Sequence, residues 1–348
     1  MTPEDIRFPE FQGHCVNVSV INGARSHMLA EMLVHPAPVD KKYLDLAGYS
    51  FLIESRNRGQ KVLYDLAFMK DLENRMPPAL KAMFTSNDVM GIDEFQHVPD
   101  TIKAQGVDLS EINSIIWSHA HIDHVGDPSV FPSTTELVVG PGLKANYIPG
   151  YPTNPNAFVL DSAFEGRTVR EIDFAECKTT IGGFRAADFF GDGSFWILEA
   201  PGHTSHHICA LCRTTEDSWL LLGGDACHSI AQLRPNSFRP LPETVSEESI
   251  GRLRSEVSSC NHASPACHKS REKSIYDLAP AMAEDLKMAE ETVEKLKAFD
   301  GRDDVMIILA HDATLLDSLE FFPESIADWK AKDKATQGRW LFLKDLKA

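Results

Sequence analysis

Short apolar runs, many of them β-branched, recur along the chain and predict β-strands. Residues 14–23 alternate polar and apolar side chains, as a half-buried strand does. Residues 48–55 and 61–68 flank a polar turn, which predicts a hairpin. Further strands are expected at 112–119, 135–140, 168–175, 194–200, 206–212, 218–226 and 304–312.

Other segments have helical spacing or are interrupted by proline. Residues 71–84 and 91–106 favour helix and loop, with a break at Pro77-Pro78. Residues 241–257, 281–299 and 315–332 predict helices, and Gly301 ends the second of these. The strands fall into two runs, each followed by helices, and no Gly/Ser linker separates them. We therefore expect one domain over residues 1–348, built from packed sheets with outer helices.

Composition restricts the class of partner. The 348 residues are 43% hydrophobic, which suffices for a large core, and the formal net charge is −17. An acidic chain disfavours nucleic acid and anionic membrane surfaces as partners. The sequence starts without a basic, apolar leader and has no bilayer-length apolar stretch, which predicts a cytoplasmic protein.

The cysteine pattern agrees with a reducing compartment, because the seven cysteines are odd in number and scattered. Cys209 and Cys212 lie three apart in an expected strand, so they should face opposite sides as core thiols. Cys260 and Cys267, near His262 and His268, resemble a metal clip or a disulfide, although we favour a coincidence in a loop.

The sequence SHAHIDHVGD, residues 118–127, crowds imidazoles and carboxylates together at the end of an expected strand. Such groups are costly to desolvate unless something satisfies all of them. His119 and His121 should point one way, since an extended chain repeats every two residues. Asp123 and His124 follow where the chain turns toward Asp127-Pro128, an expected helix start. Two metal ions could use all four side chains more easily than one.

The same arrangement recurs downstream. His203, Asp225 and His311 each follow or end an apolar strand. A single histidine in such a place is more often a hydrogen-bonded structural residue. Four polar sites at strand ends instead favour a metal centre at one edge of a sheet.

These motifs resemble the metallo-β-lactamase superfamily in its five-histidine, two-aspartate form. The resemblance rests on His119-x-His121-x-Asp123-His124, Gly202-His203-Thr204, Asp225 and His311, with Asp65 at the family's early aspartate. It covers nearly the whole chain and implies an α/β fold, an αββα four-layer sandwich. It also implies two divalent metal ions, the first held by His119, His121 and His203 and the second by Asp123, His124 and His311. Asp225 would bridge the two, and a bridging hydroxide would be the nucleophile. Zinc suits these nitrogen and oxygen ligands, with iron and manganese as alternatives.

Within the superfamily the chain is most similar to the acyl-homoserine lactonase branch. That branch has Asp-x-x-Tyr at the bridging aspartate, whereas this chain has Asp225-Ala226-Cys227-His228. A histidine can protonate a leaving nitrogen, which favours a small cyclic amide over an ester. We therefore expect Asp123, Asp225 and His228 to be catalytic and the substrate to be a lactam, cyclic carbamate or lactone. A resemblance to fungal benzoxazolinone-type lactamases favours a lactam of that type. For His228, a role as a residue that only lines the pocket has the same weight as a catalytic role.

Two alternative functions remain within the family. A glyoxalase-II-like thioesterase shares all seven ligands, and a mononuclear iron persulfide dioxygenase is disfavoured by the complete second ligand set. His207 falls at a structural histidine of the family, whereas His206 is not expected to be a ligand. Residues Phe68, Met69, Tyr147 and Tyr151 are candidates for a flat apolar cleft. The expected partner is a small cyclic molecule, and homo-oligomerisation stays open.

Overall fold

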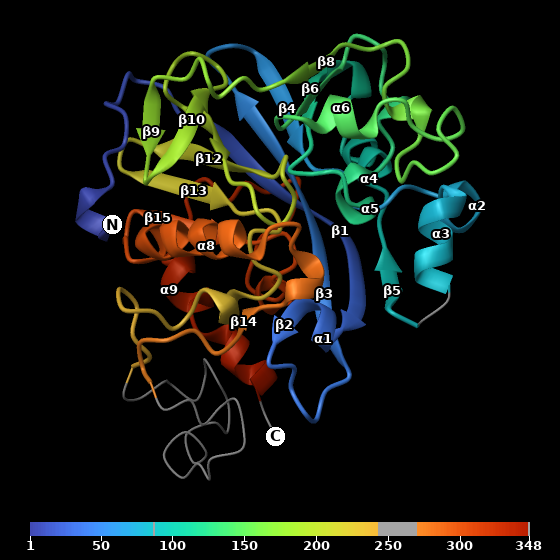
Figure 1. The fold of residues 1–348 in the computed structure, drawn as a ribbon. Coiled ribbons are helices and arrows are strands. Elements are labelled where there is room, and N and C mark those ends of the chain that lie inside the picture. The colour runs from blue at the N-terminus through green and yellow to red at the C-terminus, as the bar shows by residue number, and fades with distance from the viewer. Residues whose placement is uncertain (86–87, 243–269, 347–348) are drawn as a thin grey trace.

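Two β-sheets packed face to face form the centre of the molecule (Figure 1). The structure is a computed structural model and describes residues 1–85, 88–242 and 270–346. None of the helices within these ranges is long and apolar enough to cross a membrane.

The first sheet has seven strands in the order β5-β1-β3-β4-β6-β7-β8. Strands β4, β6, β7 and β8 run parallel to one another, whereas β5, β1, β3 and β4 pair antiparallel. The bounds are β1 Asn17–Leu29, β3 Tyr43–Ser55, β4 Gln60–Tyr64, β5 Met90–Phe95, β6 Ile112–Ile116, β7 Glu136–Val139 and β8 Val169–Glu171.

The second sheet has six strands in the order β15-β13-β12-β11-β10-β9, and its β13 and β15 are parallel. The bounds are β9 Thr179–Ile181, β10 Phe184–Asp188, β11 Phe195–Glu199, β12 Ile208–Thr215, β13 Ser218–Leu222 and β15 Val305–Ile308. A small separate sheet pairs β2, Val34–His35, with β14, Asp277–Leu278.

Helices cover the outer faces of both sheets. The longest, α8, spans Leu286–Asp300 and packs Val293, Leu296 and Phe299 into a core with the second sheet. Helix α4 buries Val98 and Ile102 in a core behind the first sheet. The other α-helices in the described part of the chain are α1 Ala30–Leu33, α2 Leu72–Arg75, α3 Pro78–Thr85, α5 Ile122–Val125, α6 Leu143–Tyr147 and α9 Lys334–Gly338.

A third core fills the space between the sheets. Val18 and Phe51 from the first sheet meet Ile197 and Leu220 from the second, all at most 2% exposed. Together with the two outer cores this gives four layers, helix, sheet, sheet, helix, as the sequence predicts. The dominant stabilisation is the removal of these apolar faces from water.

Most of the predicted elements are present. The hairpin of β3 and β4 is confirmed, as is the interruption between α2 and α3. Ala289, Val293 and Leu296 lie on the buried face of α8, which ends at Asp300 beside Gly301. Cys209 and Cys212 are buried free thiols in cores on opposite sides of β12, as alternation requires.

Two predictions of local structure are wrong, and one hairpin was missed. Residues 315–332 form turns and not a closing helix, because the middle of this segment is bonded to β1. The backbone N–H groups of Phe322 and Ile326 donate to Val20 and Val18, and Pro323 has no N–H to continue a helix. Residues 90–95 form β5 instead of helix or loop, and the β9–β10 hairpin was not predicted. Residues 243–257 of the helix expected at 241–257, and the Cys260 and Cys267 pair, lie outside the described residues.

The start of α8 is fixed against the loop that follows β11. The backbone N–H of Asp285 donates to Gly202, and that of Glu284 donates to His203. Gly202 has a φ of +136°, and a Cβ there would lie 2.2 Å from the backbone nitrogen of Ala289. Only glycine lets the loop approach the helix this closely. The position of His203 therefore depends on this contact.

Gly202→Ala should lower the free energy of unfolding by about 3 kcal/mol, because it adds backbone strain and a steric clash. Gly166→Ala is the matched control, since Gly166 also has a positive φ, +70°, but faces open space. The control should lose only about 1 kcal/mol. Urea unfolding measures both variants, and equal losses would contradict the close packing of α8 on Gly202.

Candidate metal centre

The polar residues singled out in the sequence meet at one end of the two sheets. His119, His121, Asp123 and His124 follow β6, with the last two in α5. His203 follows β11, Asp225 follows β13, and His311 follows β15. Strand ends from both sheets therefore supply one cluster, although these residues are separated by up to 192 positions in the chain (311 − 119).

The first group consists of His119, His121, His203 and Asp225. The Nε2 atom of His203 lies 3.1 Å from Nε2 of His119 and 3.0 Å from Nδ1 of His121. Oδ2 of Asp225 lies 3.8 Å from Nε2 of His119 and 3.6 Å from Nε2 of His203. His119, His203 and Asp225 are at most 4% exposed.

The second group consists of Asp123, His124 and His311. The Nε2 atoms of His124 and His311 are 3.3 Å apart. The Asp123 carboxylate lies 3.9 Å from Nε2 of His124 and 3.5 Å from Nε2 of His311. Oδ1 of Asp225 is 3.2 Å from Nε2 of His124 and 3.1 Å from Nε2 of His311. The carboxylate of Asp225 thus faces both groups.

These separations fit divalent metal ions. Ligand atoms about 2.1 Å from a tetrahedral zinc ion lie roughly 3.4 Å from one another. The separations within both groups, 3.0–3.9 Å, bracket that value. Imidazole nitrogen and carboxylate oxygen are also the donor types that such ions prefer.

The hydrogen bonds behind the rings decide which nitrogen carries the proton. Nδ1 of His203 donates to the carbonyl oxygen of Met282 at 2.6 Å, and Nδ1 of His311 donates to that of Ala47 at 2.8 Å. Nδ1 of His124 donates to Oδ2 of Asp65 at 2.8 Å. In a neutral imidazole whose Nδ1 carries the proton, Nε2 has only a lone pair.

Asp65 and Ser118 extend this arrangement to His119. Asp65 accepts hydrogen bonds from the backbone N–H and the hydroxyl of Ser118, both at 2.7 Å. Because the Ser118 hydroxyl donates to Asp65, its oxygen accepts from Nδ1 of His119 at 3.0 Å. Asp65 adopts a φ of +59°, a strained conformation for a residue with a side chain. The three hydrogen bonds to its carboxylate offset that strain.

When all four imidazoles are neutral, their Nε2 lone pairs and the Asp225 carboxylate therefore converge with no proton between them. The 3.1 Å contact between Nε2 of His119 and Nε2 of His203 is then a contact of two lone pairs. Oδ1 of Asp225 is buried and has no hydrogen-bond partner. A cation is the one kind of species that satisfies all of these atoms at once.

The electrostatics of the two groups point the same way. Burial, together with neighbouring imidazoles, holds the pKa of His119 and of His203 well below the usual histidine value. Burial also opposes charge on His124, but Asp225, Asp65 and Asp123 outweigh it and raise its pKa well above the usual value. Burial acts against ionisation of Asp225, yet His124 and His311 outweigh it and hold its pKa well below the usual range. The site therefore favours positive charge next to an ionised Asp225.

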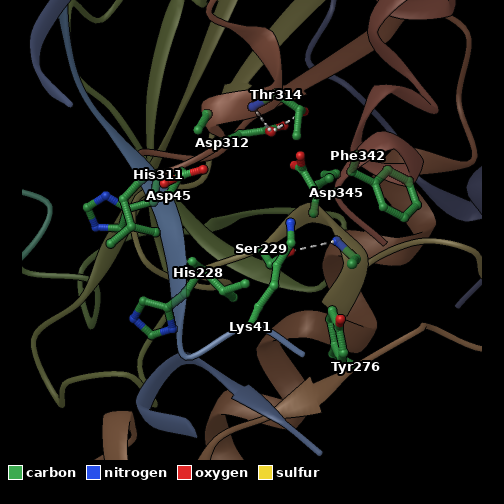
Figure 2. A pocket seen from close by; sticks show the side chains of 15 residues that line it. Lys41, Asp45, His228, Ser229, Tyr276, His311, Asp312, Thr314, Phe342 and Asp345 are labelled. Atoms are coloured by element: carbon green, nitrogen blue, oxygen red, sulfur yellow. Dashed lines mark hydrogen bonds between the residues drawn. The ribbon is translucent and has the colours of Figure 1, made fainter. Parts of the chain in front are cut away.

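His228 lies beside both groups. Its Nε2 is 3.5 Å from Oδ2 of Asp225, and its ring centre is 4.8 Å from that of His203. The ring of His228 is parallel to that of His311 within 9°. Both residues line a cavity of about 50 Å³, and Figure 2 shows their rings on the same side of it, pointing away from Lys41 and Asp345. The Nε2 atom is buried without a hydrogen-bond partner, so it is available to a bound molecule.

His206 and His207 support the cluster without joining it. Nδ1 of His207 donates to the carbonyl of Ala200, and its Nε2 accepts from the backbone N–H of Asp225 at 3.0 Å. Nε2 of His206 accepts from the backbone N–H of Ala120, which lies between two of the grouped histidines. Among the described residues, neither belongs to the two groups, as the sequence predicts.

A cavity of about 580 Å³ opens onto the cluster. Of the four residues expected to line a cleft, only Tyr147 does so. Phe68 and Met69 are buried at 1% and 5% exposure, and Tyr151 pairs with Leu160 away from the lining. Sequence reasoning missed a group of methionines in this lining, and it also missed the carbonyls of Met282 and Ala47, because a backbone acceptor has no residue-type signal.

Known proteins are similar to this chain in sequence and in fold. The family model described as "Metallo-beta-lactamase superfamily" matches residues 44–258. Metallo-hydrolase mfmC of Annulohypoxylon moriforme is 37% identical over 99% of this chain and 90% of its own length. Gamma-lactamase FDB1 of Fusarium pseudograminearum is 34% identical over 99% of this chain and 85% of its own length.

A further relative is much longer than this chain. Cytochrome P450 monooxygenase mpaDE' of Penicillium brevicompactum is 42% identical over 86% of this chain, which spans 33% of that protein. Among solved structures, an N-acyl homoserine lactone hydrolase with its product N-hexanoyl-L-homoserine bound at the catalytic metal centre superposes with a TM-score of 0.60. The two share 17% identity, covering 90% of this chain and 99% of the other. That similarity establishes the fold and confirms the αββα expectation.

Asp65→Asn should weaken zinc binding by about 10- to 100-fold while the fold is kept, because it removes the charge that holds His124 and, through Ser118, His119. Asparagine tolerates the positive φ at this position. The matched control is Asp192→Asn, since Asp192 is also buried and also accepts from a serine backbone N–H and hydroxyl, those of Ser194. Zinc titration by calorimetry measures both variants. Equal affinities in Asp65→Asn and Asp192→Asn would contradict this supporting role of Asp65.

Proposed function

The chain belongs to the metallo-beta-lactamase superfamily, and we propose that it is a binuclear metal-dependent hydrolase that opens a small cyclic amide or ester. The observation that carries the proposal is the position of Asp225, whose carboxylate lies 3.1–3.8 Å from ligand atoms of both groups. A carboxylate so placed is suited to bridging two ions. A mononuclear site would leave Asp123, His124 and His311 without a role.

In this proposal the ligand sets follow the two groups. His119, His121 and His203 would hold the first ion, Asp123, His124 and His311 would hold the second, and Asp225 would contact both. Zinc suits the donor set, and iron and manganese are alternatives. Such ions would supply Lewis acidity and a water of lowered pKa at this site.

The substrate class is supported by the relatives together with the site. FDB1 is named a gamma-lactamase and aligns over nearly all of this chain, which favours a cyclic amide. The lactone hydrolase that shares the fold keeps a cyclic ester in the proposal. The monooxygenase activity in the name of mpaDE' describes a protein of which this chain matches one third, so it is not transferred.

His228 is proposed to protonate the leaving atom. Its buried Nε2 faces Asp225 and has no hydrogen-bond partner among the described residues, and the residue lines the large cavity as well. Opening a lactam expels an amine, which requires a proton, whereas an alkoxide leaving from a lactone requires it less. The backbone N–H of His228 donates to Oε1 of Gln232, and this bond fixes the start of the segment that carries the ring.

Asp225→Ala should reduce metal content and abolish turnover, because the variant loses the carboxylate shared by both groups. Purified wild-type protein should contain about two ions per chain, and a chelator should remove activity that zinc or manganese restores. Asp127→Ala is the control, since Asp127 is also buried and lies near the site, shortly after α5, but pairs with Arg75. Normal metal content and full activity in Asp225→Ala would exclude the binuclear assignment. One iron per chain would favour the persulfide dioxygenase alternative.

His228→Phe should keep metal content and fold, because the residue lies outside the two groups. Turnover of a lactam or cyclic carbamate should fall by roughly two to four powers of ten. Hydrolysis of a matched lactone should fall much less. Steady-state kinetics on the two substrates measures the difference. Equal losses would mean that His228 positions the carbonyl, and unchanged rates would remove it from the mechanism.

A further inference from the structure

Two polar side chains lie in the wall of the large cavity, outside the ligand groups. Apart from those groups and His228, the described residues that line this cavity are apolar except for Tyr147 and Glu284. Tyr147 is the last residue of α6, and Glu284 lies between the 3-10 helix Pro280–Met282 and α8. The proposed reaction assigns no role to either side chain, so their presence in an apolar wall requires another explanation.

The protein leaves one hydrogen-bonding atom of each side chain without a partner. The hydroxyl of Tyr147 makes no hydrogen bond to a described residue, and burial with the nearby Glu284 raises its pKa to about 12. The hydroxyl therefore keeps its proton and can donate it. The Oε2 atom of Glu284 accepts from the backbone N–H of Ser205 at 2.6 Å, whereas Oε1 has no partner among the described residues. A donor and an acceptor thus lie near each other in the cavity without being bonded to each other.

The loop that follows β11 supports both side chains. The ring of His206 meets that of Tyr147 at 68°, with the ring centres 5.0 Å apart. His206 is itself held in place, since it is 1% exposed and its Nε2 accepts from the backbone N–H of Ala120 at 3.2 Å. The neighbouring Ser205 holds Oε2 of Glu284. The hydroxyl and the carboxylate are therefore held beside the same loop.

An apolar group would be a poor occupant of this part of the cavity. A bound molecule displaces water from the Tyr147 hydroxyl and from Oε1 of Glu284, and a polar atom that loses water without gaining a partner weakens binding. A hydroxyl group on the substrate satisfies both atoms, because its oxygen accepts one hydrogen bond while its proton is donated in another. An ether or a carbonyl oxygen satisfies Tyr147 alone.

We propose that Tyr147 and Glu284 determine substrate specificity by binding a hydroxyl group that the cyclic amide or ester carries outside its reacting ring. Tyr147 donates a hydrogen bond to the oxygen of this hydroxyl, and Glu284 accepts a hydrogen bond from it. This inference rests on the proposed function for the identity of the reacting ring. The recognition of the hydroxyl can be measured in binding, without turnover.

The test uses carboxylic acids that end in three different groups. Calorimetry measures binding to the zinc-loaded protein of 5-hydroxypentanoate through 9-hydroxynonanoate, of the corresponding methoxy acids, and of alkanoates in which methyl replaces the hydroxyl. Burial of apolar surface alone favours the alkanoates. At the best chain length we expect wild type to bind the hydroxy acid about tenfold more tightly than the methoxy acid. The methoxy acid should bind about tenfold more tightly than the alkanoate, since one hydrogen bond contributes about this factor.

Two substitutions separate the two hydrogen bonds. Tyr147→Phe should abolish the preference for methoxy over alkyl, because the donor is lost. Glu284→Gln should abolish the preference for hydroxyl over methoxy, because the amide oxygen stays with Ser205 and the amide nitrogen can only donate. Tyr151→Phe and Glu290→Gln are the matched controls, since Tyr151 lies in the loop after α6, Glu290 lies on α8, and neither lines the cavity. Both controls should keep all three affinities.

Equal binding of hydroxy and alkyl acids at every length would overturn this inference, and so would a preference that neither substitution changes. A parallel assay measures hydrolysis of γ-lactones and γ-lactams that carry the same three chain ends. Hydrolysis without a hydroxyl preference supports the proposed function and overturns this inference. A hydroxyl preference in binding that the two substitutions abolish, with no hydrolysis of any ring, supports this inference and contradicts the proposed function.

Discussion

The structure depends on a constraint of proton placement: at least four imidazoles must present lone pairs to one small volume. Each ring meets this constraint through an acceptor behind it, namely the carbonyl of Met282, the carbonyl of Ala47, the Asp65 carboxylate or the Ser118 hydroxyl. If any acceptor were replaced by a donor, the proton would move to Nε2 and that ring would no longer offer a lone pair. The cluster is therefore only as well defined as the elements that carry these acceptors.

Those acceptors explain why the first sheet and α8 are needed. Ala47 lies in β3, Asp65 directly follows β4, and Met282 ends a 3-10 helix shortly before α8. Gly202 brings the start of α8 against the His203 loop, and this packing sets Met282 behind His203. Asp65 keeps a positive φ so that one carboxylate can receive Ser118 and His124 together. Strain at this residue is consistent with a functional site, since local strain persists where surrounding contacts over-determine it.

The ligand groups could be predicted from sequence because each candidate follows an apolar run, and strand ends of one architecture gather at one edge. The hydrogen-bond acceptors behind the histidine rings could not be predicted, apart from Asp65. Met282 and Ala47 act through backbone carbonyls, which every residue has. The helix predicted at 315–332 failed for a related reason, since Phe322 and Ile326 bond to β1 and tertiary pairing outweighs local spacing. The methionines that line the large cavity could not be predicted as a group, because they are scattered from Met28 to Met282 and converge only in the folded chain.

The ligand groups and the methionines that line the cavity come from largely separate parts of the fold. The ligand groups lie on loops after β6, β11, β13 and β15, whereas Met28, Met32 and Met90 lie on β1, α1 and β5. Of the methionines that line the cavity, only Met282 also accepts a hydrogen bond from a grouped histidine. It does so through its backbone carbonyl, which a side-chain substitution leaves in place. A substitution among the lining methionines can therefore change the shape of the cavity while the histidines keep their hydrogen bonds. The lining of the cavity can thus vary separately from the side chains grouped around Asp225.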